Sequence, residues 1–271
     1  MKRTKSMYLA LVVLLSPMVA NADTISIGFD SAAPGTIQDS TGQGTGLTDR
    51  LSGTGGSIAT QDPNLSLDTG SGVLNITSTP SDINGQINLG LGEYLGVNLS
   101  SLGFTGSEDF SLSATFLNIQ YSQAFDQFGL YIGADADTNF RAGYLFFFPG
   151  FDEQLFSVHN TTGLDSNLTL GAGPLVGSTL SITLGRVGGI YSLGFNGTDF
   201  SILQPSFLNG FTDLNVGIFA ANSRNDTPKG AIVDSFSVTV DTPVSVPEPG
   251  TLALLGIGLF GMGLARRKRK A

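Results

Sequence analysis

Apolar and polar residues alternate along much of the chain between positions 23 and 243. In the run Phe110–Phe116 every second residue is apolar, and the runs 179–184, 191–195 and 214–218 follow the same rule. Successive side chains of a β-strand point to opposite faces, so this period of two predicts strands that each place one face on a core. Glycine supplies 37 of the 271 residues, which argues against helices. We expect about twelve strands and no helix in this region.

The last alternating run contains a residue that does not fit. Ile232, Phe236, Val238 and Val240 would share the apolar face of one strand. Asp234 falls on that face as well, although carboxylates are rarely buried without a partner. The pattern predicts a strand here and marks Asp234 as its exception.

Turn signals separate the runs. Asn196-Gly197 is a strong signal for a two-residue hairpin, and Gly188-Gly189 links the two strands before it. Three consecutive antiparallel strands are therefore expected over about 179–202. Residues 41–72 are rich in Gly, Ser, Thr and Asp, which predicts a long loop region with room for one edge strand.

Charge is distributed unevenly along the sequence. Three of the 13 Lys and Arg residues precede position 6 and five follow position 265, whereas of the 22 acidic residues only Glu248 lies in the C-terminal tail. Residues 23–243 therefore hold 5 cations and 21 acids, a net charge of −16 against −9 for the whole chain. Such a body repels nucleic acid. The absence of cysteine excludes disulfides and thiolate metal sites, and the single histidine, His159, leaves little basis for a zinc site or a catalytic triad.

The N-terminus has the plan of a secretory signal peptide. Lys2, Arg3 and Lys5 precede an apolar stretch, and the small residues Ala20 and Ala22 flank Asn21 in a cleavage pattern. We expect residues 1–22 to be removed by signal peptidase, giving a mature start at Asp23. An uncleaved anchor helix is the alternative.

The C-terminus combines a proline-rich linker, 244–250, with an uncharged stretch, 251–265, and a basic end, 266–271. As a helix the uncharged stretch reaches about 22 Å, short of a bilayer core of about 30 Å. Snorkelling cations and local thinning make up the difference, so a single transmembrane helix is expected. The basic end then stays in the cytoplasm and the body, 23–243, faces outward.

At these residues a resemblance becomes specific. Val246, Pro247, Glu248 and Pro249, the glycine-rich apolar stretch and the terminal Arg/Lys cluster resemble the PEP-CTERM sorting signal of Gram-negative bacteria. The resemblance implies transient retention in the inner membrane, processing by an exosortase and release to the cell surface. It also implies a link to extracellular polysaccharide and biofilm matrix. A plain C-terminal membrane anchor is the alternative.

The body carries a second, broader resemblance. About 220 residues of short strands fit a two-sheet antiparallel jelly-roll sandwich. The order of features is similar to the concanavalin-A-like lectin/glucanase superfamily, including laminin-G-like domains. It rests on Phe110–Phe116, Phe128–Gly133, Leu180–Leu193 and the closing run Ala231–Val238, with its Asp before a Phe. The superfamily contains binders and enzymes, so the resemblance implies a fold and no activity.

Oxygen ligands recur at every second position in one loop. Asp135, Asp137 and Asn139 have the spacing that opens a calcium loop, and calcium is the one cofactor for which the sequence has candidate ligands. Phe140 and Phe146 stand where an EF-hand has its glycine and bidentate glutamate, which excludes that motif. The favoured interpretation is a polar hairpin loop, with which Arg141 pairs.

Paired carboxylates for glycoside hydrolysis are not evident. Glu108-Asp109 and Asp152-Glu153 are adjacent pairs, and neighbours on a strand point to opposite faces. We predict no catalytic residues, and interpret His159, after the run 154–158, as a surface residue at a turn. The aromatic run 144–148 is expected to pack mainly in the core, with an exposed glycan-binding patch as the alternative.

Together these features predict an exported, non-enzymatic surface or matrix protein with a structural, adhesive or glycan-binding role. A polysaccharide hydrolase or lyase of the same fold is the alternative. The sequence identifies neither the ligand nor the partner.

Overall fold

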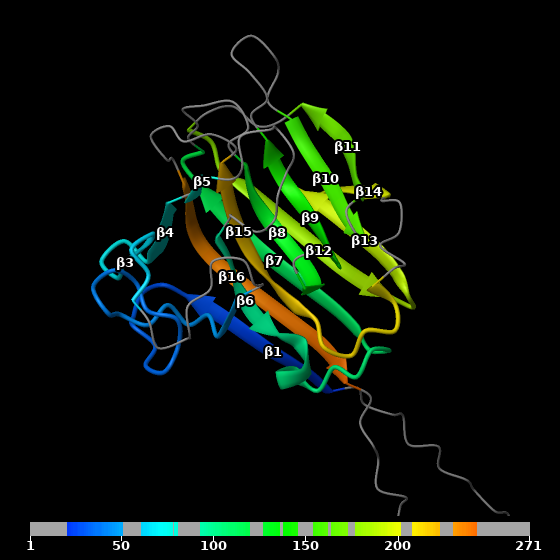
Figure 1. Cartoon of the computed structure of the whole chain (residues 1–271), viewed down its shortest axis with the longest axis horizontal. Coiled ribbons are helices and arrows are strands. Elements are labelled where there is room, and N and C mark those ends of the chain that lie inside the picture. The colour runs from blue at the N-terminus through cyan, green and yellow to red at the C-terminus, as the bar shows by residue number, and fades with distance from the viewer. Residues whose placement is uncertain are drawn as a thin grey trace, which may run out of the picture. The chain divides into compact units, whose positions relative to one another are not determined.

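The computed structural model is built of β-strands arranged in two sheets (Figure 1). It describes residues 21–50, 61–77, 79–80, 93–119, 127–135, 138–145, 154–161, 164–172, 177–201, 208–222 and 230–242. Ala22–Thr242 form one compact unit. The signal-peptide residues 1–20, the linker, the expected transmembrane stretch and the basic end lie outside the described residues. In the part of the chain that the structure describes, no helix is long and apolar enough to cross a membrane.

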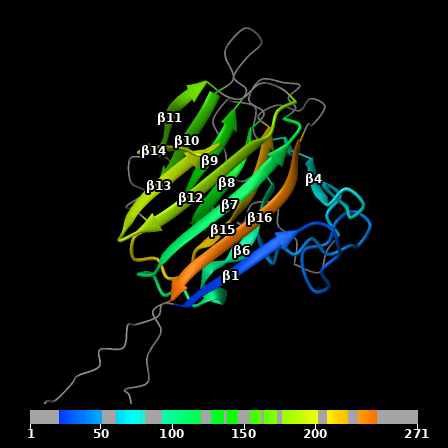
Figure 2. The same cartoon turned by 180° about the vertical axis from the view of Figure 1, so that it is seen from behind.

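The first sheet, sheet I, has the order β14–β13–β12–β7–β16–β4–β3, and β1 also pairs with β16. Figure 2 shows β1, β16, β7 and β12 side by side. Its strands are β1 (Asn21–Gly28), β3 (Leu65–Asp68), β4 (Val73–Thr77), β7 (Asp109–Leu117), β12 (Leu180–Val187), β13 (Ile190–Phe195), β14 (Thr198–Ser201) and β16 (Gly230–Thr242).

The second sheet, sheet II, has the order β11–β10–β9–β8–β15–β6–β2. A short strand, β5, pairs with β15 in parallel, whereas the recorded pairings along that order are antiparallel. Its strands are β2 (Asp49–Arg50), β5 (Thr79–Pro80), β6 (Glu93–Asn98), β8 (Gln127–Asp135), β9 (Thr138–Leu145), β10 (Gln154–Thr161), β11 (Leu164–Ala172) and β15 (Asn215–Asn222).

The expectation of an all-β, two-sheet antiparallel sandwich is confirmed. The described residues form sixteen strands rather than about twelve, because two-residue strands such as β2 and β5 are too short to show a period. One 3₁₀ turn, η2 (Leu99–Leu102), follows β6. The side chain of Asn98 caps it by accepting the backbone N–H of Ser100 at 2.8 Å, and Gly103 ends it at φ 80°.

The core lies between the sheets and is filled by the alternating residues recognised in the sequence. In β7 the burial alternates along the strand, with Phe110, Leu112, Ala114 and Phe116 buried. Aromatic contacts join the sheets, for example between Phe116 of β7 and Phe128 of β8, whose ring centres are 4.9 Å apart. Burial of these apolar faces is the main force that holds the sandwich together.

The two hairpins expected over 179–202 are present. Asn196 and Gly197 have φ angles of 47° and 78°, and Gly188 and Gly189 have 58° and 80°. Both positions of a type I′ turn need positive φ, which Asn and Gly adopt most easily. The strands β12, β13 and β14 are therefore consecutive antiparallel neighbours.

Asp234 is exposed because β16 contains a bulge. The register against β7 shifts between Val233 and Ser235, so the phase of the strand changes at that point. Before the bulge Val233 faces the core, and after it Phe236 and Val238 do. The prediction that Ile232 shares their face was wrong for this reason, since Ile232 is only half-buried.

The segment 41–72 contains more order than its composition suggests. Asp39 is fully buried beside it and accepts hydrogen bonds from the backbone N–H groups of Thr41, Gln43 and Leu67. Burial acts to raise the pKa of Asp39, but these hydrogen bonds outweigh it and lower the pKa. The carboxylate thus ties the loop to β3, an edge strand of sheet I. Residues 51–60 lie outside the described part.

Candidate functional site

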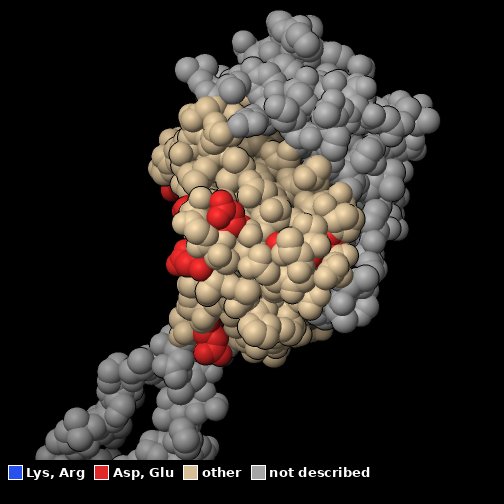
Figure 3. Space-filling view, turned by 90° about the vertical axis from the view of Figure 1, so that its left-hand side faces the viewer, with Lys and Arg blue, Asp and Glu red and all other residues tan. Residues whose placement is uncertain are grey.

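The two outer faces of the sandwich, which point away from the core, have different side chains. Figure 3 views the molecule from one side, where acidic side chains lie scattered over an otherwise uncharged surface. No Lys or Arg of the described residues is in view there.

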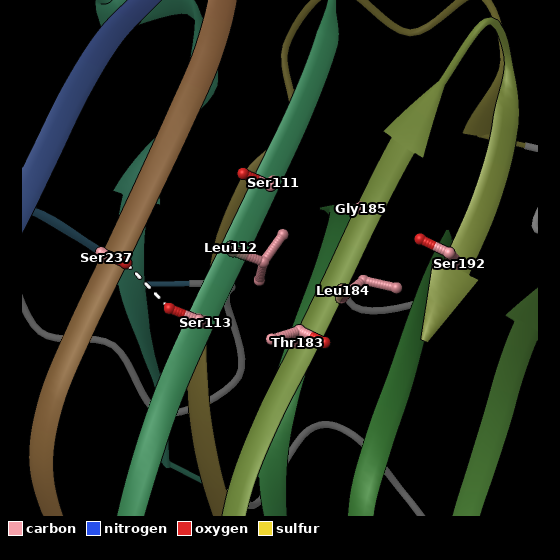
Figure 4. A pocket seen from close by; sticks show the side chains of 8 residues that line it. All are labelled: Ser111, Leu112, Ser113, Thr183, Leu184, Gly185, Ser192 and Ser237. Atoms are coloured by element: carbon pink, nitrogen blue, oxygen red, sulfur yellow. Dashed lines mark hydrogen bonds between the residues drawn. The ribbon is translucent and has the colours of Figure 1, made fainter. Parts of the chain in front are cut away.

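The outer face of sheet I is covered with hydroxyl groups. A shallow depression of about 290 Å³ lies over β7, β12 and β13, and Gly185 contributes no side chain to it (Figure 4). The hydroxyls pair with one another across strands: Ser113 with Ser237 at 2.8 Å and Thr115 with Ser181 at 3.4 Å. The depression is polar and has no charged residue in its lining, and its hydroxyls largely satisfy one another, as expected for a sheet face in contact with water.

The outer face of sheet II carries aromatic rings and an arginine. Tyr94 of β6 stacks on Phe219 of β15 with ring centres 5.5 Å apart, and Tyr131 of β8 meets Tyr94 edge-on at 5.5 Å. Arg141 of β9 lies 6.0 Å from the ring centre of Phe219, and its Nη1 donates to the hydroxyl of Tyr94 at 3.0 Å. Their strand neighbours belong to the core, so these four side chains lie on the opposite face.

These four side chains are buried although they lie outside the core. Tyr131, Arg141 and Phe219 have no exposed surface, and Tyr94 is 3% exposed. Both faces of β8, β9 and β15 are therefore excluded from water. The outer face of sheet II is thus buried and carries aromatic rings and an arginine, whereas the outer face of sheet I carries hydroxyls in contact with water.

Two cross-strand glycine pairs flank this cluster. Gly96 lies opposite Gly217, and Gly129 lies opposite Gly143. A Cβ on Gly217 would come within 2.0 Å of the Leu95 carbonyl oxygen, and one on Gly129 within 2.1 Å of the Ala142 carbonyl oxygen. No larger residue fits, and each glycine pair continues a cross-strand row of the cluster, because Gly129 lies opposite Phe219 and Gly217 lies opposite Tyr131.

An amide row crosses the same face near the hairpin end of β8 and β9. Asn215 lies opposite Gly133, which in turn lies opposite Asn139. The Oδ1 atom of Asn215 and the Oε1 atom of Gln127, at the other end of β8, are buried without a hydrogen-bond partner. Unpaired buried acceptors are uncommon, because each forfeits its hydration without compensation.

Arg141 is the most unusual member of the cluster. Its Nε and Nη2 atoms are buried without a hydrogen-bond partner. Among the described residues both ion pairs belong to Arg50, which bridges Asp62 and Glu93, so no described carboxylate neutralises Arg141. The predicted pairing of Arg141 with the acidic loop was wrong. Its partner Tyr94 is distant in sequence and is brought to it by the strand order β6–β15–β8–β9.

The predicted sorting and cleavage residues lie mostly outside the described part of the chain. This applies to Val246, Pro247, Glu248, Pro249 and Ala20. Ala22 is described and is exposed near the start of β1. Cleavage after Ala22 would remove the first two residues of β1, and it stays a prediction.

The predicted calcium ligands are only partly described. Asp135 is exposed at the end of β8, Asn139 is buried in β9, and Asp137 lies outside the described residues. The Nδ2 atom of Asn139 donates to the backbone carbonyl of Asp135 at 3.3 Å. Among described residues no three His, Cys, Asp or Glu side chains gather as a metal site. Calcium binding stays a prediction, and the loop does join a β8–β9 hairpin.

The adjacent acids Glu108 and Asp109 serve different local contacts. The Glu108 carboxylate accepts the Thr105 hydroxyl at 2.6 Å, whereas Asp109 accepts the backbone N–H of Gly188 at 2.7 Å. Burial acts to raise the pKa of Glu108, but hydrogen bonds from Thr105 and Ser107 lower it to about 2. The second adjacent pair, Asp152-Glu153, lies outside the described residues.

One acidic pair was missed in the sequence. Glu93 and Asp62 lie 31 positions apart and share Arg50, with Asn64 donating to Glu93 at 2.9 Å. Burial, reinforced by the neighbouring Asp62, raises the pKa of Glu93 despite Arg50. Both carboxylates are occupied by these contacts, so the group joins β2, β6 and the β3 loop. No local sequence signal identifies it, since its members come from three separate segments.

His159 lies within a strand and not at a turn. β10 continues to Thr161, and His159 has Phe140 and Ser166 as its register partners. The alternation before it ends at Val158, which made the strand look shorter than it is. The aromatic residues 146–148 lie outside the described part, and Tyr144 before them is buried.

Residues 245–270 match the PEP-CTERM protein-sorting motif. The match confirms the resemblance drawn from Val246 to Lys270 and marks the chain as an exported protein directed to the cell surface. Processing by an exosortase is what this motif implies. No protein with a curated description matches the sequence significantly.

Solved structures resemble the body at low sequence identity. A protein of unknown function from Shewanella oneidensis MR-1 is 11% identical with a TM-score of 0.51, over 90% of this chain and 100% of that one. Xylan beta-1,4-xylosidase from Bacillus halodurans C-125 is 14% identical with a TM-score of 0.49, over 67% of this chain but only 35% of that one. Alginate lyase A1-II′, of polysaccharide lyase family 7, is 13% identical with a TM-score of 0.47, over 72% and 94%. The first likeness shows a shared fold.

Proposed function

We propose that this PEP-CTERM protein is a non-enzymatic component of the cell surface or extracellular matrix that binds polysaccharide through the outer face of sheet II. The aromatic and arginine cluster carries the proposal. Sugar sites combine apolar rings with a few well-placed hydrogen-bonding groups, and Tyr94, Phe219, Tyr131 and Arg141 supply both. The residues that line the depression on sheet I include neither an aromatic ring nor a charged side chain.

The glycine pairs and amides support the same face. Gly96 and Gly217 leave backbone without side chains in the strands that carry Tyr94 and Phe219, and glycine inside a strand often marks a site where a ligand or another backbone approaches closely. Asn215 and Gln127 bring unpaired acceptors, which suit the hydroxyl donors of a sugar.

Burial of the cluster has a kinetic consequence. Arg141 has no exposed surface in the ligand-free fold, so a ligand reaches it only after a local rearrangement. Association is then slower than the usual protein range of about 10⁵–10⁷ M⁻¹s⁻¹. Stopped-flow binding that saturates with ligand concentration is the expected signature.

A glycan array probed with the exported form of the protein tests the proposal. Phe219→Ala is expected to abolish the signal, whereas Thr183→Ala, on the hydroxyl face, is expected to leave it unchanged. Equal loss in both variants, or no glycan bound by the wild type, contradicts the proposal. Release of new reducing ends or unsaturated sugars from a bound polysaccharide contradicts the non-enzymatic part and favours a hydrolase or lyase.

Processing is proposed to follow the sorting motif: cleavage of residues 1–22, transient retention in the inner membrane, then exosortase action near Pro247–Pro249. Intact-mass measurement of the extracellular form is expected to show both ends removed. A complete C-terminus in the secreted fraction contradicts this order of events.

A further inference from the structure

We infer that Arg141 is the recognition point for a carboxylate, and that the ligand is a mostly neutral polysaccharide carrying isolated uronic acid residues. This inference rests on the proposed function, since it names the chemical class of the ligand at the same face. Arg141 makes one of its possible side-chain hydrogen bonds and leaves Nε and Nη2 without partners.

A guanidinium group has five N–H donors in one plane. In Arg141 the Nη1 edge is fixed by the Tyr94 hydroxyl at 3.0 Å and by the ring of Phe219 below it. The Nε and Nη2 atoms, which together form the opposite edge, have no partner. That edge presents two parallel donors, the arrangement that holds both oxygens of a carboxylate.

A buried cation without a counter-ion is a strained state of a folded protein. The desolvation cost of burying a guanidinium is offset only when an opposite charge lies beside it and its N–H groups have hydrogen-bond acceptors. Arg141 is 0% exposed, with half of its plane unmatched and no described carboxylate beside it. An anion from a ligand supplies what is absent, and a neutral sugar does not.

Arg186 provides an internal comparison. It is the other buried arginine without an ion pair among the described residues, at 3% exposed. Its Nη1 donates to the Gly106 carbonyl at 3.1 Å and its Nη2 to the Glu108 carbonyl, while the rings of Phe104 and Phe110 flank its guanidinium carbon. Backbone oxygens thus satisfy both terminal nitrogens of Arg186, and only its Nε lacks a hydrogen-bond partner. The two arginines therefore differ at Nη2, which is bonded in Arg186 and has no partner in Arg141.

The charge of the body limits how acidic the ligand can be. Residues 23–243 carry a net charge of −16, which repels a dense polyanion. This repulsion is screened beyond about 8–10 Å at physiological salt, so a single carboxylate that reaches Arg141 escapes most of it. A chain of neutral sugars with occasional uronates meets both conditions, whereas a continuous polyuronate does not.

Calorimetric titration of the full exported protein with gellan oligosaccharides tests the inference. Each gellan repeat carries one isolated glucuronate, and carboxyl reduction turns it into glucose without changing the rest. The wild type is expected to bind the acidic form at least about tenfold more tightly than the reduced form, the usual effect of a charged hydrogen bond. Polygalacturonate is expected to bind more weakly than the acidic gellan form.

Variants of Arg141 separate charge from geometry. Arg141→Met is expected to remove the preference for the carboxylate, and Arg141→Lys to restore only part of it, because a lysine keeps the charge without the paired donors. Arg141→Met is also expected to raise the melting temperature of the ligand-free protein, since it removes an unpaired buried charge. The control Arg186→Met is expected to lower the melting temperature and to keep the preference.

The possible results are distinguishable. Three results overturn the inference but leave the proposed function standing. They are equal binding of the acidic and reduced forms, a preference for the acidic form that survives Arg141→Met, and binding of neutral polysaccharides alone. Tighter binding of polygalacturonate overturns the assignment to isolated uronates. A wild type that binds no polysaccharide overturns the proposed function together with the inference.

Discussion

The outer faces of the two sheets have the same strand geometry but differ in solvent exposure and in how their polar groups are hydrogen-bonded. On sheet I, hydroxyls such as Ser113 and Ser237 bond to each other and remain in contact with water. On sheet II, Tyr94, Phe219 and Arg141 form a covered layer in which Nε and Nη2 of Arg141 have no hydrogen-bond partner. The hydroxyls of sheet I satisfy one another, whereas these two donors are the basis of the proposed ligand site.

The largest expected contrast comes from truncation of a side chain on each face. Phe219→Ala removes a fully buried ring that stacks on Tyr94, which is expected to cost about 3–5 kcal/mol of unfolding free energy. Thr183→Ala alters an exposed position of sheet I and is expected to stay within about 0.5 kcal/mol. Urea denaturation of both variants measures the difference. Similar losses of unfolding free energy in the two variants would show that the two faces contribute equally to stability.

Matched glycine substitutions give the next largest effect. In Gly217→Ala the new methyl meets the Leu95 carbonyl at 2.0 Å, so the backbone must shift and a loss of about 1–3 kcal/mol is expected. In Gly185→Ala the nearest atom, the Phe110 carbonyl oxygen, is 3.3 Å away, and the expected change is below about 1 kcal/mol. Thermal unfolding ranks the two variants. A more harmful Gly185→Ala would contradict the view that the position of Gly217 needs bare backbone more than that of Gly185 does.

Calcium tests the hairpin at the end of the sheet II face. If Asp135, Asp137 and Asn139 bind the ion, millimolar calcium is expected to raise the melting temperature by a few degrees, and a chelator to reverse this. Asp135→Ala is then expected to remove the response. An unchanged melting temperature in the wild type would leave the loop as a polar hairpin without a metal.

The smallest effect concerns the loop before β7 of sheet I. Hydrogen bonds from Thr105 and Ser107 outweigh burial and lower the pKa of Glu108 from 4.5 to about 2. The ionised form therefore stabilises the fold above about pH 4.5, and this contribution is lost as the pH falls towards about 2. Glu108→Gln is expected to flatten the decline of the melting temperature in that window. A decline as steep as in the wild type would assign the acid sensitivity to other carboxylates.

The hydroxyl face was largely predictable from the sequence, and the covered face was not. The run Phe110–Phe116 shows its two sides directly, because one side is apolar and the other is serine and threonine. In Phe128–Gly133 both sides are buried, with Phe, Leu and Ile in one phase and Gly, Tyr and Gly in the other, so neither side carries the polar residues that mark a water-facing surface.

Arg141 and Asp234 show two further limits of prediction from sequence. Arg141 was assigned to its neighbours in the chain, whereas it contacts Tyr94 and Phe219 on other strands. Such contacts depend on strand order and register, which single-sequence patterns do not contain. Asp234 contradicted its strand pattern because of a bulge, and a bulge changes the phase by one residue without any motif of its own.

The position of β16 bears on when this protein is able to fold. β16 is the last strand before the tail, yet it lies inside sheet I, with β7 on one side and β4 and β1 on the other. Sheet I remains split into two parts until Gly230–Thr242 leave the ribosome. Sheet I therefore cannot close until nearly all of the body has been synthesised, which suits a polypeptide that is exported before it assumes its final shape.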